Sequence, residues 1–331
     1  MNKIFNILDE RSREKLTEKS QPDWTSPMLA TLTHDHFSDK DWIYERKLDG
    51  QRCLVFKKGK KVRLMSRNKK QINNQYPEII EAFEKQGHDF IVDGEIVAFD
   101  GKVTSFSKLQ PRMHSSKPDL SIDVFFYAFD IIYLEGYDLS GLELRHRKAL
   151  LKEAVDFDRI NLRFTTHRNK EGEKFLKEAC QKGWEGLIAK DVSSTYKHDR
   201  SKKWLKFKCE KGQELVICGY TAPGGSRKYF GALIVGYFDD GELKHAGKVG
   251  TGYDEKTLKR VHDKMEKLKQ DDPPFDRDKP GYKEVTWLKP KLVGEFRFTE
   301  WTNDNKLRHP SFLGLRDDKK AKDVRKEEPE S

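Results

Sequence analysis

Apolar residues recur at helical spacing in three segments of the chain, 76–87, 173–183 and 254–269. Apolar positions three or four residues apart lie on one face of an α-helix, and the first two segments end on glycine, a common helix terminator. Elsewhere, short runs rich in β-branched and aromatic residues are bounded by Asp-Gly, Glu-Gly or Pro, as strands often are: "DFIVDGEIVAFDGKV", "IDVFFYAFDIIYLEG" and "WEGLIAKD". This pattern over residues 24–211 predicts an α+β domain with antiparallel hairpins.

The pattern changes from Gln213 onward, where several short strands accompany a single helix. This combination within about 110 residues is typical of a small barrel such as the OB-fold, a common nucleic-acid-binding module. We therefore expect a polar lead-in (1–23), the α+β domain (24–211), a β-rich OB-fold domain (212–318) and a charged tail (319–331) that frays.

The charge of the chain favours a polyanionic partner. Charged residues make up 36% of the 331 residues and hydrophobic residues 35%, and the formal net charge is +10. An excess of positive charge attracts nucleic acid, although many basic enzymes only carry solvated lysines.

The cysteines and the N-terminus indicate an intracellular protein. Cys53, Cys180, Cys209 and Cys218 form no Cys-x-x-Cys pair and have no histidine at metal-ligand spacing. We therefore expect no structural zinc, and reduced thiols in a cytoplasm. The first residues lack a signal-peptide core and no segment approaches membrane-spanning length, so we expect a soluble, cytoplasmic protein without membrane contact.

A lysine stands at the end of an apolar strand-like run, "WIYERKLDGQRCLVF". Strand alternation places Glu45 and Lys47 on one face, and Asp49-Gly50 then turns the chain before Arg52. A lysine acts as a covalent nucleophile when burial or neighbouring cations lower its pKa, since only the neutral amine attacks. The alternative is an exposed lysine that is paired with Asp49 in an ordinary hairpin.

Further charged side chains interrupt other strand-like runs. Glu95 lies within "VDGEIVAFD", Glu185 opens "EGLIAKD", and Lys206 and Lys208 share one face of "WLKFK". Two carboxylates and several cations in one cleft would suit a magnesium nucleotide. Taken singly, they could equally be edge-strand ion pairs and a solvated strand face.

The order of these segments resembles the motifs of ATP-dependent DNA ligases, within the covalent nucleotidyltransferase superfamily. The matching segments are Lys47-Leu-Asp-Gly-Gln-Arg52, Ser66-Arg67-Asn68, Asp93-Gly-Glu95, Ala128-Phe-Asp-Ile-Ile-Tyr133, Glu185-Gly-Leu-Ile-Ala-Lys190 and Trp204-Leu-Lys-Phe-Lys208. In the second domain, "GKVGTGYD" and "RHPSFLGLRDDK" are similar to segments of the bacterial ligase D and ligase C modules. The resemblance runs from about Pro27 to Val324 and implies a nucleotidyltransferase (adenylation) domain followed by an OB-fold domain.

The resemblance implies a role for each matching residue. Lys47 would attack the α-phosphorus of ATP and hold AMP covalently, with Asp49 in the turn that orients it. Glu45 would meet the adenine amino group, Phe129 would stack on the base, and Arg52 would reach the ribose or phosphates. Arg67 would touch ATP or nick phosphates, and Glu95 and Glu185 would organise Mg²⁺ (or Mn²⁺) and the ribose. Lys206 and Lys208 would bind the α-phosphate and depress the pKa of the Lys47 amine, and the last motif would close over ATP with Arg308, Arg316, Asp318 and Lys319.

The implied function is a minimal stand-alone ligase that seals nicked double-stranded DNA with ATP, as a monomer, in repair or end joining with a Ku-type partner. Two departures are modest: Leu48 stands where relatives often have an aromatic residue, and His309 follows Arg308, as in the ligase D-like branch. The alternatives are an RNA ligase or capping-type guanylyltransferase, which share the lysine motif, and a non-catalytic OB protein that binds nucleic acid.

Overall fold

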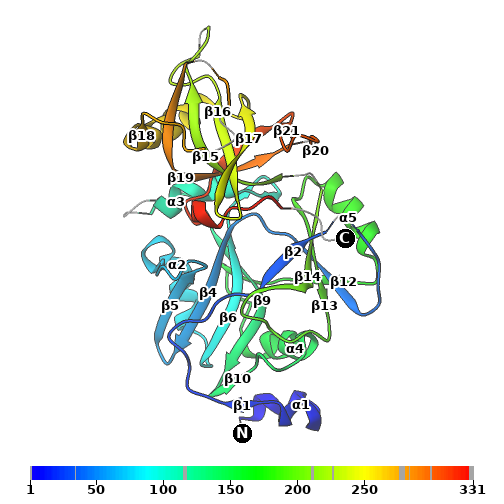
Figure 1. The fold of residues 1–331 in the computed structure, drawn as a ribbon. Coiled ribbons are helices and arrows are strands. Elements are labelled where there is room, and N and C mark those ends of the chain that lie inside the picture. The colour runs from blue at the N-terminus through cyan, green and yellow to red at the C-terminus, as the bar shows by residue number, and fades with distance from the viewer. Residues whose placement is uncertain are drawn as a thin grey trace. The chain divides into compact units, whose positions relative to one another are not determined.

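The computed structural model describes residues 2–33, 35–114, 118–209, 212–225, 227–275, 280–282, 284–298 and 300–327. The chain divides into two compact units, Met1–Cys209 and Glu210–Glu328. Each is described by itself below (Figure 1).

The first unit contains a seven-stranded sheet in the order β1-β10-β9-β6-β4-β5, with β11 parallel to β9. Its strands are β1 (Thr17–Glu18), β4 (Gln51–Lys58), β5 (Lys61–Ser66), β6 (Phe90–Val97), β9 (Phe125–Leu134), β10 (Tyr137–Asp138) and β11 (Leu162–Phe164). One face is covered by apolar side chains from η1 (Lys3–Ile7), α2 (Pro77–Glu84), α3 (Phe106–His114) and α4 (Leu144–Ala154). The neighbouring short elements are α1 (Glu10–Glu14), η2 (Asn73–Gln75), β7 (Phe99–Asp100) and β8 (Val103–Thr104).

A five-stranded sheet in the order β12-β3-β13-β14-β2 completes the first unit. Its strands are β2 (Leu29–Leu32), β3 (Trp42–Arg46), β12 (His167–Asn169), β13 (Gly186–Asp191) and β14 (Arg200–Lys208). Helix α5 (Gly172–Gln181) packs on one face, against buried Tyr44, Leu187 and Phe207. The other face joins the seven-stranded sheet through a shared apolar cluster that includes Ile43 and Trp204.

The second unit is a six-stranded sheet, β17-β16-β15-β19-β18 with β22 beside β19. Its elements are β15 (Gly212–Thr221), β16 (Leu233–Asp239), β17 (Glu242–Val249), α6 (Glu255–Met265), η3 (Glu266–Leu268), β18 (Lys269–Gln270), β19 (Val285–Arg297), β20 (Glu300–Trp301), β21 (Leu307–Arg308), β22 (Ser311–Leu315) and η4 (Ala321–Asp323). Register shifts interrupt the pairing of β15, β17 and β19, and such bulges bend a sheet. The core therefore forms inside a curled sheet, with α6 packed on it by Leu258, Val261 and Met265.

The helices expected at 76–87, 173–183 and 254–269 are present as α2, α5 and α6. Helix α4 was not predicted. No helix of the described ranges is long and apolar enough to cross a membrane.

The structure corrects the expectation of a frayed tail for residues 319–327, and residues 328–331 of that tail lie outside the described residues. Ala321 and Val324 are buried in the core of the second unit, and the backbone N–H of Glu327 donates to the side chain of Gln213. The charged run "KKAKDVRK" contains these two apolar residues, and both pack against an apolar surface that only the folded sheet provides. This packing holds residues 319–327 on the second unit.

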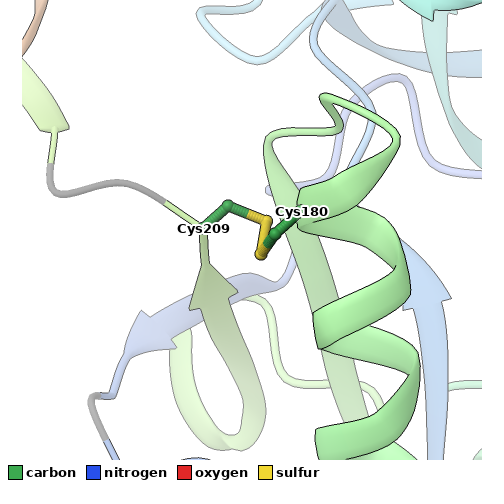
Figure 2. Close-up of a disulfide and its surroundings, with 2 residues drawn as sticks. All are labelled: Cys180 and Cys209. Carbon is green, nitrogen blue, oxygen red and sulfur yellow. A yellow bond between two sulfur atoms is a disulfide. The ribbon is translucent and has the colours of Figure 1, made fainter.

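The expectation of four reduced thiols is also wrong in this structure. Cys180, near the end of α5, forms a disulfide with Cys209, which directly follows β14 (Figure 2). The two positions are 29 residues apart in the sequence, and their Cα atoms lie 5.3 Å apart. Sequence spacing could not show this pair because α5 and the end of β14 meet only through the fold. Cys53 and Cys218 are free and buried.

Candidate active site

Lys47 directly follows strand β3, and the structure fixes its backbone on both sides. Its N–H donates to the carbonyl of Gly186 on β13 (2.9 Å), so the sheet ladder extends one residue beyond the strand. The turn after it is anchored as well, because the carboxylate of Asp49 accepts from the N–H of Phe106 (2.9 Å). A Cβ at Gly50 would lie 2.2 Å from the carbonyl oxygen of Ile96, a contact that only glycine avoids.

The side chain of Lys47 forms an ion pair with Glu185. Burial of the amine would lower its pKa, but the Glu185 carboxylate outweighs burial and the nearby Lys208, and it holds the Lys47 pKa above its ordinary value. Lys208 lowers the Lys47 pKa, as expected, but the ion pair with Glu185 sets the net direction and keeps the amine protonated. A contribution of Lys206 to this pKa stays a prediction.

Cross-strand register brings the expected residues onto one face of the five-stranded sheet. Glu45 on β3 pairs with Ile188 on β13, and Ile188 pairs with Lys206 on β14. In the next row, Gly186 pairs with Lys208 and also accepts the hydrogen bond from Lys47. Directly opposed residues point to the same face of a sheet, so these two rows present one carboxylate, Glu45, and three lysines, Lys47, Lys206 and Lys208.

Leu205 and Phe207 lie on the opposite face of β14. Phe207 is fully buried among the residues that pack against α5, and Leu205 packs against the same cluster. The prediction that Lys206 and Lys208 share one face of this strand, with Leu205 and Phe207 on the other, is confirmed.

Glu45 lies in a buried charge cluster that the sequence did not reveal. Lys148, from α4, donates to its Oε1 (2.5 Å), and the Lys190 ammonium lies 2.7 Å from its Oε2. Burial would raise the Glu45 pKa, but the two ammonium groups outweigh burial and keep the pKa below its ordinary value. Burial in turn lowers the Lys190 pKa to about 8. Lys190 belongs to a quoted motif, whereas Lys148 lies outside all of them, and no sequence signal marks it.

The seven-stranded sheet contributes Arg52, held by a second buried carboxylate. Its guanidinium makes two hydrogen bonds of 2.6 Å with Asp93, which also accepts from the hydroxyl of Tyr196 (2.5 Å). Arg52 and Glu95 are cross-strand partners on β4 and β6, so the half-buried Glu95 lies on the same face. The sequence assigned no role to Asp93, although it is the first residue of the quoted Asp-Gly-Glu motif.

Phe129 lies between cations and a second ring. Its side chain is 8% exposed, with Arg52 at 4.6 Å and Lys190 at 4.3 Å from its ring centroid, and Trp204 meets it edge to face. The next residue, Asp130, is paired with Arg147 in full burial (2.8 Å). This pair fixes the strand on which Phe129 stands, and the role of Phe129 as a base platform stays a prediction.

The remaining expected residues belong to other elements. Arg67 is half-buried in the turn after β5. Arg316 belongs to the second unit, where it is paired with Asp318 (2.9 Å) and Glu295 (3.1 Å). Burial would raise the Asp318 pKa, but Arg316 outweighs burial and lowers it.

Two basic residues of the last motif, Arg316 and Lys319, are paired with carboxylates of the second unit. Lys319 forms an ion pair with Glu214 (2.6 Å), and Arg308 is exposed on β21. Their approach to a nucleotide stays a prediction.

Comparison with known families assigns the chain to a class. Residues 27–208 match the family described as ATP dependent DNA ligase domain, and residues 226–319 match the ATP dependent DNA ligase C terminal region. The chain therefore belongs to the ATP-dependent DNA ligase family, a family of enzymes, and the expected nucleotidyltransferase domain with a following OB-fold domain is confirmed.

The relatives are of the ligase D type. The multifunctional non-homologous end joining protein LigD of Pseudomonas aeruginosa is 34% identical over 316 residues, which cover 93% of this chain and 37% of that protein. LigD of Mycobacterium bovis is 36% identical over 311 residues, 91% of this chain and 40% of that protein. The chain thus spans less than half the length of these relatives.

A solved structure of a mycobacterial DNA ligase D complexed with ATP and MES matches this chain with a TM-score of 0.68 and 34% identity. The match covers 92% of this chain and 99% of the chain in that structure. The ligase domain of Mycobacterium tuberculosis LigD has a TM-score of 0.51 with the same identity and coverage. The expected ligase D-type resemblance is confirmed. The RNA-directed and non-catalytic alternatives are not favoured.

Proposed function

We propose that this chain seals nicks in double-stranded DNA with ATP, through a covalent AMP on Lys47. The observation that supports this most directly is the sheet face on which Lys47, Glu45, Lys206 and Lys208 lie together, in a chain that matches the DNA ligase family along most of its length.

The reaction has three displacements at phosphorus. The neutral Nζ of Lys47 attacks the α-phosphorus of ATP, a P–N bond forms, and pyrophosphate leaves. An oxygen of the DNA 5′-phosphate then attacks the same phosphorus and releases the lysine. Finally the 3′-hydroxyl attacks the 5′-phosphate and AMP leaves. In such transfers, positioning and charge stabilisation supply most of the catalysis.

The ion pair with Glu185 controls the first step. Only a neutral amine attacks, whereas Glu185 keeps Lys47 protonated. When Glu185 moves to a new partner, burial and the positive charge of Lys208 both favour the neutral amine. We therefore assign the activation of Lys47 to the loss of this ion pair as ATP binds.

We assign a divalent cation to Glu95 and Glu185, which are both half-buried carboxylates. Mg²⁺ or Mn²⁺ prefers hard oxygen ligands, and Mg²⁺ usually takes one or two carboxylates together with substrate phosphates. A bound ion would neutralise phosphate charge. Glu185 as a metal ligand would also leave Lys47 without its partner.

The remaining roles are proposed on the same face and in the last motif. We assign Glu45 and Phe129 to the adenine, Arg52 to the ribose or phosphates, Arg67 to ATP or nick phosphates, Lys206 and Lys208 to the α-phosphate, and Arg308, Arg316, Asp318 and Lys319 to closure over ATP. Glu45 is ionised and accepts hydrogen bonds only, which suits an amino group.

Labelling with ATP tests the proposal. Incubation with α-labelled ATP and Mg²⁺ should leave acid-labile label on the protein and seal a nicked duplex, whereas GTP and NAD should give none. Lys47→Ala should abolish the label, and Lys58→Ala, at an exposed lysine that ends β4, should retain it. Label on the Lys47→Ala protein would contradict the mechanism, and preference for GTP or for RNA ends would favour the RNA-directed alternative.

The biological setting is proposed from the relatives. We infer a cytoplasmic, monomeric protein that acts in end joining with a Ku-type partner, with domain limits at 24–211 and 212–318. A reducing cytoplasm would open the Cys180–Cys209 disulfide. Joining of double-strand ends with and without a Ku-type protein tests the pathway, and identical rates would contradict it.

A further inference from the structure

Cations and aromatic rings form a row of contacts around Arg46, the residue before the proposed nucleophile. The cation–aromatic row consists of Lys182, Trp184, Arg46, Phe99, Phe125 and Arg163. Arg46 directly precedes Lys47, and its guanidinium carbon lies 4.4 Å from the ring centroid of Trp184 and 5.8 Å from that of Phe99. Lys182 Nζ lies 5.3 Å from the centroid of the same ring.

The row continues along the start of β9. The ring centroids of Phe99 and Phe125 are 5.7 Å apart, and the guanidinium carbon of Arg163 lies 5.3 Å from the ring of Phe125. All three aromatic residues of the row are half-buried rather than sealed in a core, so each keeps some surface for a ligand.

Arg46 differs from Arg52 and Lys190, two cations of this unit that lie over the Phe129 ring. Arg52 is paired with Asp93 and Lys190 with Glu45. In Arg46, Nε and one terminal nitrogen are buried without a hydrogen-bond partner among the described residues. A buried donor without an acceptor costs free energy, and this burial lowers the Arg46 pKa. An anion beside the guanidinium would offset that cost.

We propose that the cation–aromatic row is a binding surface for one strand of the DNA next to the nick, with Arg46 on a backbone phosphate. The inference rests on the proposed ligase function and adds how the substrate is held. Guanidinium and ammonium groups bind phosphates, and aromatic rings stack on sugars and bases. A row that contains both kinds of side chain therefore suits a DNA strand, in which charged phosphates alternate with sugars and bases. Arg46 directly precedes Lys47 in the chain, and strand alternation points the two side chains to opposite faces of the sheet. The held strand would therefore pass beside the end of β3, the strand that carries the nucleophile.

The test compares DNA affinity of the full chain with that of single variants. Arg46→Met and Lys182→Met remove a charge from the row, and Lys174→Met is the matched control, an exposed lysine of α5 that is paired with Glu171 (3.0 Å). Fluorescence anisotropy with a nicked duplex carrying a 5′-phosphate gives Kd at several salt concentrations. We expect Arg46→Met to bind about tenfold more weakly and to reduce the slope of log Kd against log salt by about 1, with a smaller loss for Lys182→Met.

Step-resolved assays separate binding from folding and from the first reaction step. The rate of nick sealing should fall about tenfold relative to the rate of self-adenylylation in Arg46→Met, while Lys174→Met keeps the wild-type ratio. Lys182 is exposed, so its variant reports on binding without disturbing a core. Wild-type affinity and salt slope in both row variants would overturn the inference, as would a loss of thermal stability in Arg46→Met with unchanged DNA binding. A wild-type protein that neither binds nor seals nicked DNA would overturn the proposed function as well.

Discussion

Replacement of Glu45 by glutamine would leave two buried ammonium groups without a counter-charge. Glu45 and Lys190 are each 2% exposed and Lys148 is 5% exposed. One carboxylate and two ammonium groups give the cluster a net charge of +1 (−1 + 2). Glu45→Gln raises this charge to +2, whereas Lys148→Met lowers it to 0 and leaves the Glu45–Lys190 pair.

The two changes should therefore differ in cost. Removal of one partner of a buried ion pair typically costs about 3–5 kcal/mol of unfolding free energy, and we expect Glu45→Gln to reach this range. Lys148→Met loses hydrogen bonds to Glu45 and to the carbonyl of Thr165 but strands no buried cation. We expect a cost of about 1–3 kcal/mol for Lys148→Met.

The loss of unfolding free energy in each variant is measured by urea unfolding of the full chain. Unfolding is monitored by hydrogen exchange in peptides covering 42–46 and 186–191, which report on the unit that contains the cluster. Lys152→Met, at an exposed position of the same helix, is the control and should stay within about 0.5 kcal/mol of wild type. A Lys148→Met variant that is destabilised as much as Glu45→Gln would refute the view that the carboxylate neutralises both lysines.

Three further outcomes follow from the structure. Gly50→Ala would place a Cβ 2.2 Å from the Ile96 carbonyl oxygen and should abolish self-adenylylation, whereas Gly87→Ala meets no atom within 4 Å and should be neutral; label on Gly50→Ala would count against a fixed turn. Cys180→Ser opens a link between positions 29 residues apart and should lower the unfolding free energy by about 3–4 kcal/mol; an unchanged urea midpoint would contradict this. Because burial lowers the Lys190 pKa from 10.5 to about 8, the unfolded chain binds more protons between these values, and stability from this group should rise with pH across that window. Lys190→Met should flatten the rise, and an identical pH profile would refute it.

Part of the site was predictable because it depends on local order. The Asp49-Gly50 turn after Lys47 and the alternation that puts Lys206 and Lys208 on one face of β14 both follow from residues within a few positions of one another. Strand alternation has a period of two wherever the strand lies, so these features hold before the partners of the strand are known. The motif order then identified the family from the sequence.

The charges that decide the chemistry depend on distant pairings. Lys148 is 103 residues from Glu45, and Glu185 reaches Lys47 only because β13 pairs with β3. Sequence pattern states which face of an element a side chain occupies, but register between distant elements decides which charge lies opposite it. The sequence by itself therefore determined the two-domain class, the set of charged residues and the lysine that is the candidate nucleophile. Only the tertiary structure decided that Glu185 keeps Lys47 protonated, because the Coulomb energy of a buried pair depends on a separation that the chain order does not contain.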